Sequence, residues 1–149
     1  WAPRVWNMFD FAADARDQGG EPGMNHKGLV TFDRKTRKDS FWLYKAYWSN
    51  DPFVHIASKR FVDRTEDTIT VKVYTNQNEV TLFVNGDKLE TKYGDRVFEF
   101  TVPMSAETKV KATSGEYADE ATFRKVSNPN PDYVLKDTGD KGANWTNKE

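Results

Sequence analysis

The stretch EVTLFVNGDKLE, Glu79–Glu90, carries the clearest structural signal in this sequence. Apolar residues occupy every second position from Val80 to Val84, which indicates a β-strand with one buried face. Asn85 and Gly86 follow directly, and this dipeptide is the preferred turn of a two-residue β-hairpin. The stretch therefore predicts two antiparallel strands joined by a tight turn.

The same alternation extends to both sides of this hairpin. It recurs in TITVKVYT (Thr68–Thr75) and in RVFEFTVPM (Arg96–Met104). Two further strand-like segments follow, TKVKATSG (Thr108–Gly115) and YADEATFRKV (Tyr117–Val126). Short strands at a spacing of about 8–12 residues are typical of an all-β sandwich. The chain is thus predicted to be mainly β, with an immunoglobulin-like β-sandwich over residues 51–126. The predicted core consists of apolar residues at alternate strand positions: Val71, Val73, Leu82, Val84, Val97, Val102 and Val110.

Composition excludes several classes of function. The 149 residues carry a net charge of -1, which gives no electrostatic basis for binding nucleic acid or an anionic membrane. There is no cysteine, so disulfides and thiolate metal sites are excluded. No apolar run approaches the ~20 residues that span a bilayer. We therefore expect no nucleic acid, no membrane and no cofactor among the partners of this chain.

The first third of the chain, Val5–Trp48, is rich in aromatic and amide side chains but lacks a simple local pattern. RVWNMFDF (Arg4–Phe11) fits a short buried strand, and residues 12–28 are polar and glycine-rich, as in a long loop. DSFWLYKAYW (Asp39–Trp48) is predicted as a helix, because Asp39 or Ser40 can cap its N-terminus. Its predicted packing face, at helical spacing, consists of Phe41, Tyr44, Lys45 and Trp48.

Few residues suit catalysis or metal binding. His26 and His55 are far apart in the sequence, and two histidines without cysteine make a poor metal site. Asp10 and Asp14 are the acids next to the aromatic strand. A structural role at the strand end is favoured over a catalytic pair, because acid–base work needs two carboxyl groups held in one pocket. We therefore assign no catalytic residue and no metal ligand to this chain.

A sugar-binding subsite is the chemistry that the remaining residues suit. Trp6 offers a flat apolar face, which matches the C–H face of a sugar ring. Asn7 and Asn25 offer both donors and acceptors for hydroxyl groups. Lys27 adds a positive charge, which suits a carboxylate or a polarised hydroxyl. The alternative is that these side chains simply pack in a core.

Two phrases in this region, VWNMFDF and NHKGLVTFDRKTRKDSFWLYKAYW, resemble the end of the catalytic (β/α)8 barrel of glycoside hydrolase family 2. That family contains β-galactosidases and β-glucuronidases. The resemblance covers Val5–Trp48, where a Trp-Asn phrase, an Asn-x-Lys-Gly loop and a closing helix follow in that order. The next segment, VYTNQNEVTLFVNGDKL, resembles the immunoglobulin-like domain that follows the barrel in bacterial β-galactosidases.

The resemblance implies a role for each candidate residue. Trp6 would line the sugar pocket, and Asn25 and Lys27 would sit on the last loop of the barrel, at the face where barrel active sites lie. The two catalytic glutamates of the family lie on earlier strands, so this chain alone would not perform the retaining hydrolysis of the family. The Asn-x-Lys pair resembles the one that β-glucuronidases use for the uronate carboxylate, but the surrounding sequence looks more like the β-galactosidase branch.

Three regions are expected: a remnant of the barrel over 1–50, the sandwich over 51–126, and a linker or further domain over 127–149. The main interpretation is a C-terminal fragment of a bacterial β-galactosidase. Its expected partners are a β-galactoside or related sugar, the rest of the barrel and, for the isolated fragment, a second copy that covers exposed aromatic side chains. A stand-alone carbohydrate-binding sandwich and a structural spacer are the alternatives. The sequence indicates no cellular compartment.

Overall fold

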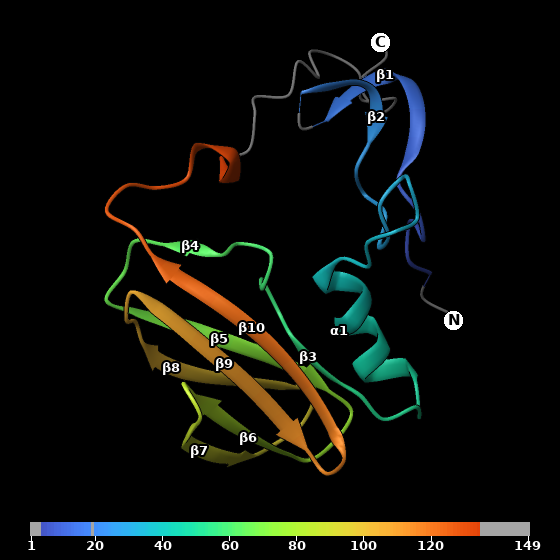
Figure 1. Cartoon of the computed structure of the whole chain (residues 1–149). Coiled ribbons are helices and arrows are strands. Elements are labelled where there is room, and N and C mark those ends of the chain that lie inside the picture. Colours follow the sequence, from blue (N-terminus) through green and yellow to red (C-terminus); the bar gives the residue numbers. More distant parts are fainter. Residues whose placement is uncertain (1–3, 19, 135–149) are drawn as a thin grey trace. The chain divides into compact units, whose positions relative to one another are not determined.

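The computed structural model describes residues 4–18 and 20–134 (Figure 1). These residues form two compact units, which divide between Phe41 and Trp42, and the second unit ends at Tyr133. Each unit has β-structure of its own. Among the described residues, no helix is long and apolar enough to cross a membrane.

The second unit is a β-sandwich of two sheets (Figure 1). The smaller sheet has the order β3 (Val54–Ile56), β5 (Thr68–Thr75) and β8 (Val97–Pro103). The larger has the order β4 (Asp63–Arg64), β10 (Tyr117–Lys125), β9 (Glu107–Ser114), β6 (Glu79–Val84) and β7 (Asp87–Tyr93). Neighbouring strands are antiparallel except β4 and β10. The prediction of a mainly β chain with a β-sandwich is confirmed.

The core of the sandwich comes from alternate residues of its strands, as the sequence pattern predicts. Val71, Val73, Leu82, Val102 and Val110 are all at most 2% exposed. Their neighbours in sequence point to the opposite face of each strand, because side chains alternate along a β-strand. The burial of these residues confirms the register predicted for β5, β6 and β9.

The core prediction is wrong at Val97, which is 37% exposed, and Val84 is only half-buried. On β8 the residues that point inward are Phe98 and Phe100, at 3% and 0% exposure. Two phenyl rings remove far more apolar area from water than one valine does. Because alternation permits only one of the two sets to be buried, Val97 lies on the outer face.

The turn between β6 and β7 has the conformation that its sequence predicts. Asn85 and Gly86 both have positive φ, at 52° and 96°, as a type I′ turn requires. Val84 pairs with Asp87 across the turn. The side-chain oxygen of Asn85 also accepts a hydrogen bond from the backbone N–H of Lys109, at 2.8 Å, which ties the turn to β9.

The helix α1 (Asp39–Trp48) forms where it is predicted, but a different face is buried. Ala46 is 1% exposed, whereas Trp48 of the predicted face is 62% exposed. Trp42 stacks on His55, with ring centroids 4.7 Å apart. Trp42 and Ala46 are four residues apart and therefore share a face of the helix. The prediction of a packing face through Trp48 is wrong.

The first unit is built on a β-hairpin of β1 (Phe11–Gln18) and β2 (Glu21–Asn25). Gln18 pairs with Glu21, and Gly20 between them has a φ of 75°. The long loop predicted over residues 12–28 is therefore wrong. Its Gly-Gly dipeptide is a hairpin signal, which the polar composition of the flanking residues concealed.

The strand predicted over Arg4–Phe11 is also wrong, since β1 begins at Phe11. Upstream of it, Phe9 makes one isolated parallel bridge with Val30, which in turn bridges Arg37. A strand needs a neighbouring strand for its backbone groups. Backbone hydrogen bonds join Asn7, Met8 and Asp10 to Leu29 and Val30, but this pairing stops after one bridge, whereas Phe11–Gln18 has β2.

The segment after the sandwich contains a short 3-10 helix, η1 (Pro131–Tyr133). The hydroxyl of Tyr133 accepts a hydrogen bond from the backbone N–H of Val62, at 2.9 Å. The Tyr133 ring also packs edge-on against Phe61. The predicted linker over 127–149 thus begins with residues bound to the sandwich. Residues 135–149 lie outside the described part of the chain, and the bounds of the three regions stay predictions.

Candidate functional site

A pocket in the first unit contains three of the four residues that the sequence nominated for sugar binding. Its volume is about 510 Å³, which lies within the range of small-molecule sites. The nominated residues Trp6, Asn25 and Lys27 line it together with Phe11, Ala13 and Arg16. Aromatic rings, one amide and two cations therefore meet in one cavity.

Trp6 supplies the largest apolar surface of this pocket. Its side chain is 74% exposed, so its ring is accessible to a ligand. It meets Phe11 edge to face, with centroids 6.2 Å apart and planes at 85°. This arrangement is a favourable one for two aromatic rings, and it leaves the flat face of the indole available for stacking.

Asn25 is the last residue of β2 and is only 4% exposed. Its side-chain oxygen accepts a hydrogen bond from the backbone N–H of Lys27, at 3.0 Å. The oxygen thereby shapes the turn that follows β2, as asparagine side chains often do. The side-chain NH2 of Asn25 is then the part of the amide that suits a ligand, and it is a donor.

Lys27 brings a positive charge to the pocket. Within the described residues, no carboxylate lies at ion-pair distance from its ammonium group. The nearby Lys38 differs, because its ammonium group lies 2.7 Å from Oδ1 of Asp10. Lys38 is thus neutralised inside the protein, whereas Lys27 is exposed and lines a pocket whose described lining residues include no acid.

A network of polar groups holds the loop that carries Asn25 and Lys27. The carboxylate of Asp10 is 2% exposed and accepts hydrogen bonds from Lys38, at 2.7 Å, and from the backbone N–H of Gly28, at 2.8 Å. Lys38 also donates to the carbonyl of His26, at 2.8 Å. Asp10 thus holds this loop in place through a buried charge that is paired with Lys38.

Gly28 is required by the close approach of two segments. A Cβ added at this position would lie 2.1 Å from the backbone nitrogen of Asp10 and 2.2 Å from the carbonyl carbon of Phe9. Both neighbours are backbone atoms, which cannot move aside as a flexible side chain can. The final glycine of the Asn-x-Lys-Gly phrase therefore lets the loop lie against the segment that leads into β1.

Asn7 is the nominated residue that does not line the pocket. Its side-chain oxygen accepts a hydrogen bond from the N–H of Met8, at 2.7 Å, and its carbonyl accepts one from Leu29, at 3.0 Å. Asn7 thus connects neighbouring segments of backbone. The peptide bond between Trp6 and Asn7 is cis.

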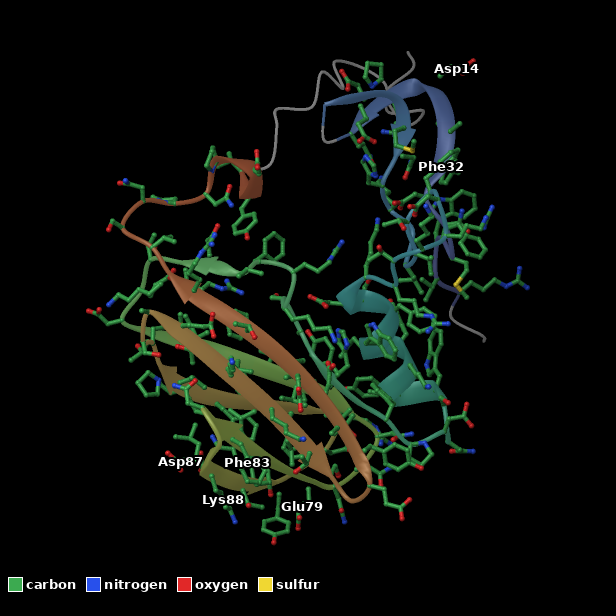
Figure 2. The ribbon with its side chains drawn as sticks, in the orientation of Figure 1. Asp14, Phe32, Glu79, Phe83, Asp87 and Lys88 are labelled. Carbon is green, nitrogen blue, oxygen red and sulfur yellow. The ribbon has the colours of Figure 1, made fainter. Side chains whose placement is uncertain are left out.

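Of the other titratable candidates, Asp10 and His26 lie close together, whereas Asp14 and His55 lie elsewhere. Asp14 is exposed on β1 (Figure 2), whereas Asp10 is buried. His26 lies beside Asp10 and Glu21, at 3.4 and 3.1 Å, and His55 belongs to the sandwich. In the part of the chain that the structure describes, no three such side chains cluster as metal ligands would.

Arg16 is the charged pocket residue that was not predicted from the sequence, and Phe11 and Ala13 were not predicted either. Arg16 lies on β1, within the stretch that was predicted to be a loop. Regular alternation along β1 would place Arg16 on the face opposite Phe11 and Ala13. The register of β1 against β2 shifts between Ala12 and Asp17, so a correct hairpin prediction alone would not have placed Arg16 in the pocket.

Known proteins match this chain along much of its length. The family described as "Domain of unknown function (DUF4982)" matches residues 66–115. A β-glucuronidase of Bacteroides fragilis is 44% identical over 117 residues, which are 78% of this chain and 16% of that protein. The chain is thus similar to a short segment of a much longer protein.

Solved structures also match this chain over one segment of their length. The crystal structure of an FMN-binding β-glucuronidase from Facaelibacterium prausnitzii L2-6 has a TM-score of 0.87 and 48% identity, over 91% of this chain and 21% of that one. A putative β-galactosidase from Bacteroides fragilis has a TM-score of 0.72 and 39% identity, over 80% of this chain and 19% of that one. The chain is therefore similar to one segment of longer glycosidases, and most of the relatives that it matches are named β-glucuronidases.

Proposed function

We infer that this chain forms one wall of the sugar site of a glycoside hydrolase family 2-like β-glucuronidase. In this proposal Asn25 and Lys27 hold the carboxylate of a β-glucuronide, and Trp6 stacks on the apolar face of the sugar ring. From the sequence alone we expected a galactoside first and a glucuronide second. We now place a glucuronide first, because a lysine and an arginine line the pocket and because most of the relatives are named β-glucuronidases.

The main support for the proposal is that the charge of Lys27 has no acidic partner among the described residues. Lys27 is an exposed residue that lines the cavity, and no carboxylate among the described residues lies at ion-pair distance from its ammonium group. A galactoside would offer it only a hydroxyl group, whereas a glucuronide offers a carboxylate. Charge-assisted hydrogen bonds are roughly twice as strong as neutral ones, so the anionic sugar is the better match.

Asn25 supports the same choice. Because its side-chain oxygen already accepts the N–H of Lys27, the amide presents donors to a ligand. A carboxylate has only acceptor sites, and two donors from one short loop suit it. The names of the relatives agree, since β-glucuronidases from Bacteroides fragilis and Facaelibacterium prausnitzii are both more than 40% identical to this chain.

The catalytic chemistry belongs to the longer protein that we propose. Retaining glycosidases use two carboxyl groups about 5–5.5 Å apart, and we assign neither to this chain. The contribution of these residues is to bind the sugar and fix its orientation. Binding of a remote carboxylate accelerates the reaction to the extent that it positions the glycosidic bond at the reacting groups.

The test is a substitution at Lys27 in the full-length protein that carries this segment. Lys27→Met removes the charge and keeps most of the length of the side chain. We expect kcat/KM for p-nitrophenyl β-D-glucuronide to fall by roughly 10- to 100-fold, since a charged hydrogen bond contributes about 1.5–3 kcal/mol. Turnover of the corresponding galactoside should not fall. An equal loss for both sugars, or a wild-type preference for galactoside, would refute the proposal.

We propose flavin mononucleotide as a second candidate ligand, for a different surface. One relative is described as FMN-binding, and the larger sheet of the sandwich carries a groove of about 580 Å³. Phe83, Lys109 and Lys111 are among its lining residues, and Figure 2 shows Phe83 on β6 near the β6–β7 turn. An aromatic ring and two cations are the groups that a flavin ring and a phosphate require.

Both lysines of this groove have partners that a phosphate could replace. Lys111 lies 3.0 Å from Glu120 and Lys109 lies 3.5 Å from Glu107. All four side chains are at least half exposed, and such pairs contribute little to stability. The purified protein should therefore quench FMN fluorescence in a saturable manner, and Lys111→Ala should weaken this binding. No saturable quenching, or equal binding of riboflavin without phosphate, would exclude FMN.

A further inference from the structure

We propose that Asp10 is a positioning residue for glucuronide recognition, acting through the loop that carries Lys27. This inference rests on the proposed function, because it concerns the same pocket. Asp10 itself is buried beneath the loop and is not among the pocket-lining residues. Its effect on a substrate must therefore be transmitted by the residues that it holds.

Asp10 and Lys38 together bind the residues on either side of Lys27. Asp10 accepts the backbone N–H of Gly28, which follows Lys27. Lys38 donates to the carbonyl of His26, which precedes it. The two charged groups also bind each other, at 2.7 Å. The backbone of Lys27 is thus held from both sides by a single ion pair.

The side chain of Lys27 takes no part in this network. Its backbone N–H donates to Asn25, and Lys27 is one of the residues that line the pocket. The ion pair of Asp10 and Lys38 therefore fixes the backbone position of Lys27. The ammonium group of Lys27 takes no part in it and can pair with a ligand. Small displacements of a binding group lower activity strongly when the geometry of the bound substrate is demanding.

The carboxylate of Asp10 cannot be replaced by a neutral group without consequence. An asparagine could still accept the N–H of Gly28, but it would leave the ammonium of Lys38, which is 21% exposed, without its counter-charge. A partly buried charge that loses its partner must move towards water or find another anion. Either movement would release the carbonyl of His26 and loosen the loop at Lys27.

The experiment combines Asp10→Asn with Lys27→Met in the full-length protein. Asp10→Asn alone should lower kcat/KM for p-nitrophenyl β-D-glucuronide by at least tenfold, mainly through KM. The residual rate on the corresponding galactoside should change by less than twofold. In the Lys27→Met background, Asp10→Asn should have less than a twofold effect on the glucuronide, because the group that it positions is gone. Asp14→Asn, at an exposed position of β1, is the matched control and should change neither rate.

The outcomes of this experiment bear on the two proposals separately. Equal losses for both sugars, or a full effect of Asp10→Asn in the Lys27→Met background, would overturn the positioning role. A selective effect of Lys27→Met with no effect of Asp10→Asn would overturn this inference alone. A Lys27→Met variant that loses no glucuronide selectivity would overturn the proposed function. Should Asp10→Asn fail to fold, Lys38→Gln removes the other half of the ion pair and is read by the same criteria.

Discussion

The indole ring of Trp42 stacks on the imidazole ring of His55, with centroids 4.7 Å apart and planes at 15°. The contact joins the helix α1 to the first strand of the sandwich, β3, within the second unit. Lys45 lies on the same side, over the ring of Phe53 at 5.1 Å. The helix thus packs on the sandwich through Trp42, and not through Trp48.

This relationship predicts which tryptophan stabilises the protein. Trp42→Ala should lower the free energy of unfolding by about 3 kcal/mol, as expected when a large packed aromatic side chain is removed. Trp48→Ala should cost less than about 0.5 kcal/mol, since a substitution at an exposed position has little effect. Urea denaturation followed by circular dichroism measures both. Similar losses for the two variants would mean that the packing face has been identified wrongly.

Leu82 and Leu89 provide a second matched pair, on the neighbouring strands β6 and β7. Leu82 is 0% exposed and Leu89 is 40% exposed. Leu82→Ala should therefore cost about 2–5 kcal/mol, whereas Leu89→Ala should cost much less. The denaturation midpoints of the two variants, compared with wild type, test the register of the hairpin. A midpoint unchanged by Leu82→Ala would place this residue on the outer face.

The hairpin from Glu79 to Glu90 was predictable because every signal in it is local. Alternation selects the buried face, and Asn85-Gly86 selects the turn. The register of β8 was harder, since both Val97 and Phe98 are apolar. There the choice depends on which set of side chains fills the space between the sheets, and this is a property of the whole sandwich.

The candidate site was predictable to the extent that its residues are chemically distinctive. Trp6, Asn25 and Lys27 have side chains that suit a sugar acid, and the resemblance to a known family placed them together. Asp10 and Arg16 were not assigned to the site. The role of Asp10 depends on an ion pair with a residue 28 positions away, and sequence spacing does not indicate such a contact.

Asp63 predicts how stability depends on pH. Asn130 and Arg124 donate hydrogen bonds to its carboxylate, both at 2.8 Å. These bonds, that of Asn130 first, hold the pKa of Asp63 below its usual value. Because the folded state favours the charged form, the contribution of Asp63 to stability is present above the pKa of an unfolded aspartate, about 3.9. It is lost as the pH falls through the lower pKa of the folded state.

The corresponding measurement compares Asp63→Asn with wild type at several pH values. The variant should be less stable at pH 7, and the difference should shrink as the pH falls below about 4. Asp87→Asn is the control, because Asp87 is exposed at the start of β7 (Figure 2). A difference between Asp63→Asn and wild type that stays constant from pH 7 to pH 2 would show that the charge of Asp63 is not responsible.

The isolated 149-residue chain should have no glycosidase activity. A retaining mechanism needs two carboxyl groups in one site, and Asp10, the buried acid of the first unit, is already paired with Lys38. Release of nitrophenol from p-nitrophenyl glucuronide and galactoside, compared with a mock purification, measures this directly. Turnover by the chain that is abolished by Asp10→Asn would mean that Asp10 is catalytic.

The central claim is that the pocket around Lys27 recognises a sugar carboxylate. Competitive inhibition of the full-length protein by D-glucuronate, D-glucose and D-galactose tests it without relying on the rate of the chemical step. The account predicts that glucuronate binds at least tenfold more tightly than either neutral sugar, and that Lys27→Met abolishes this preference. Equal inhibition by the three sugars, or tightest binding of galactose by the wild-type protein, would contradict it.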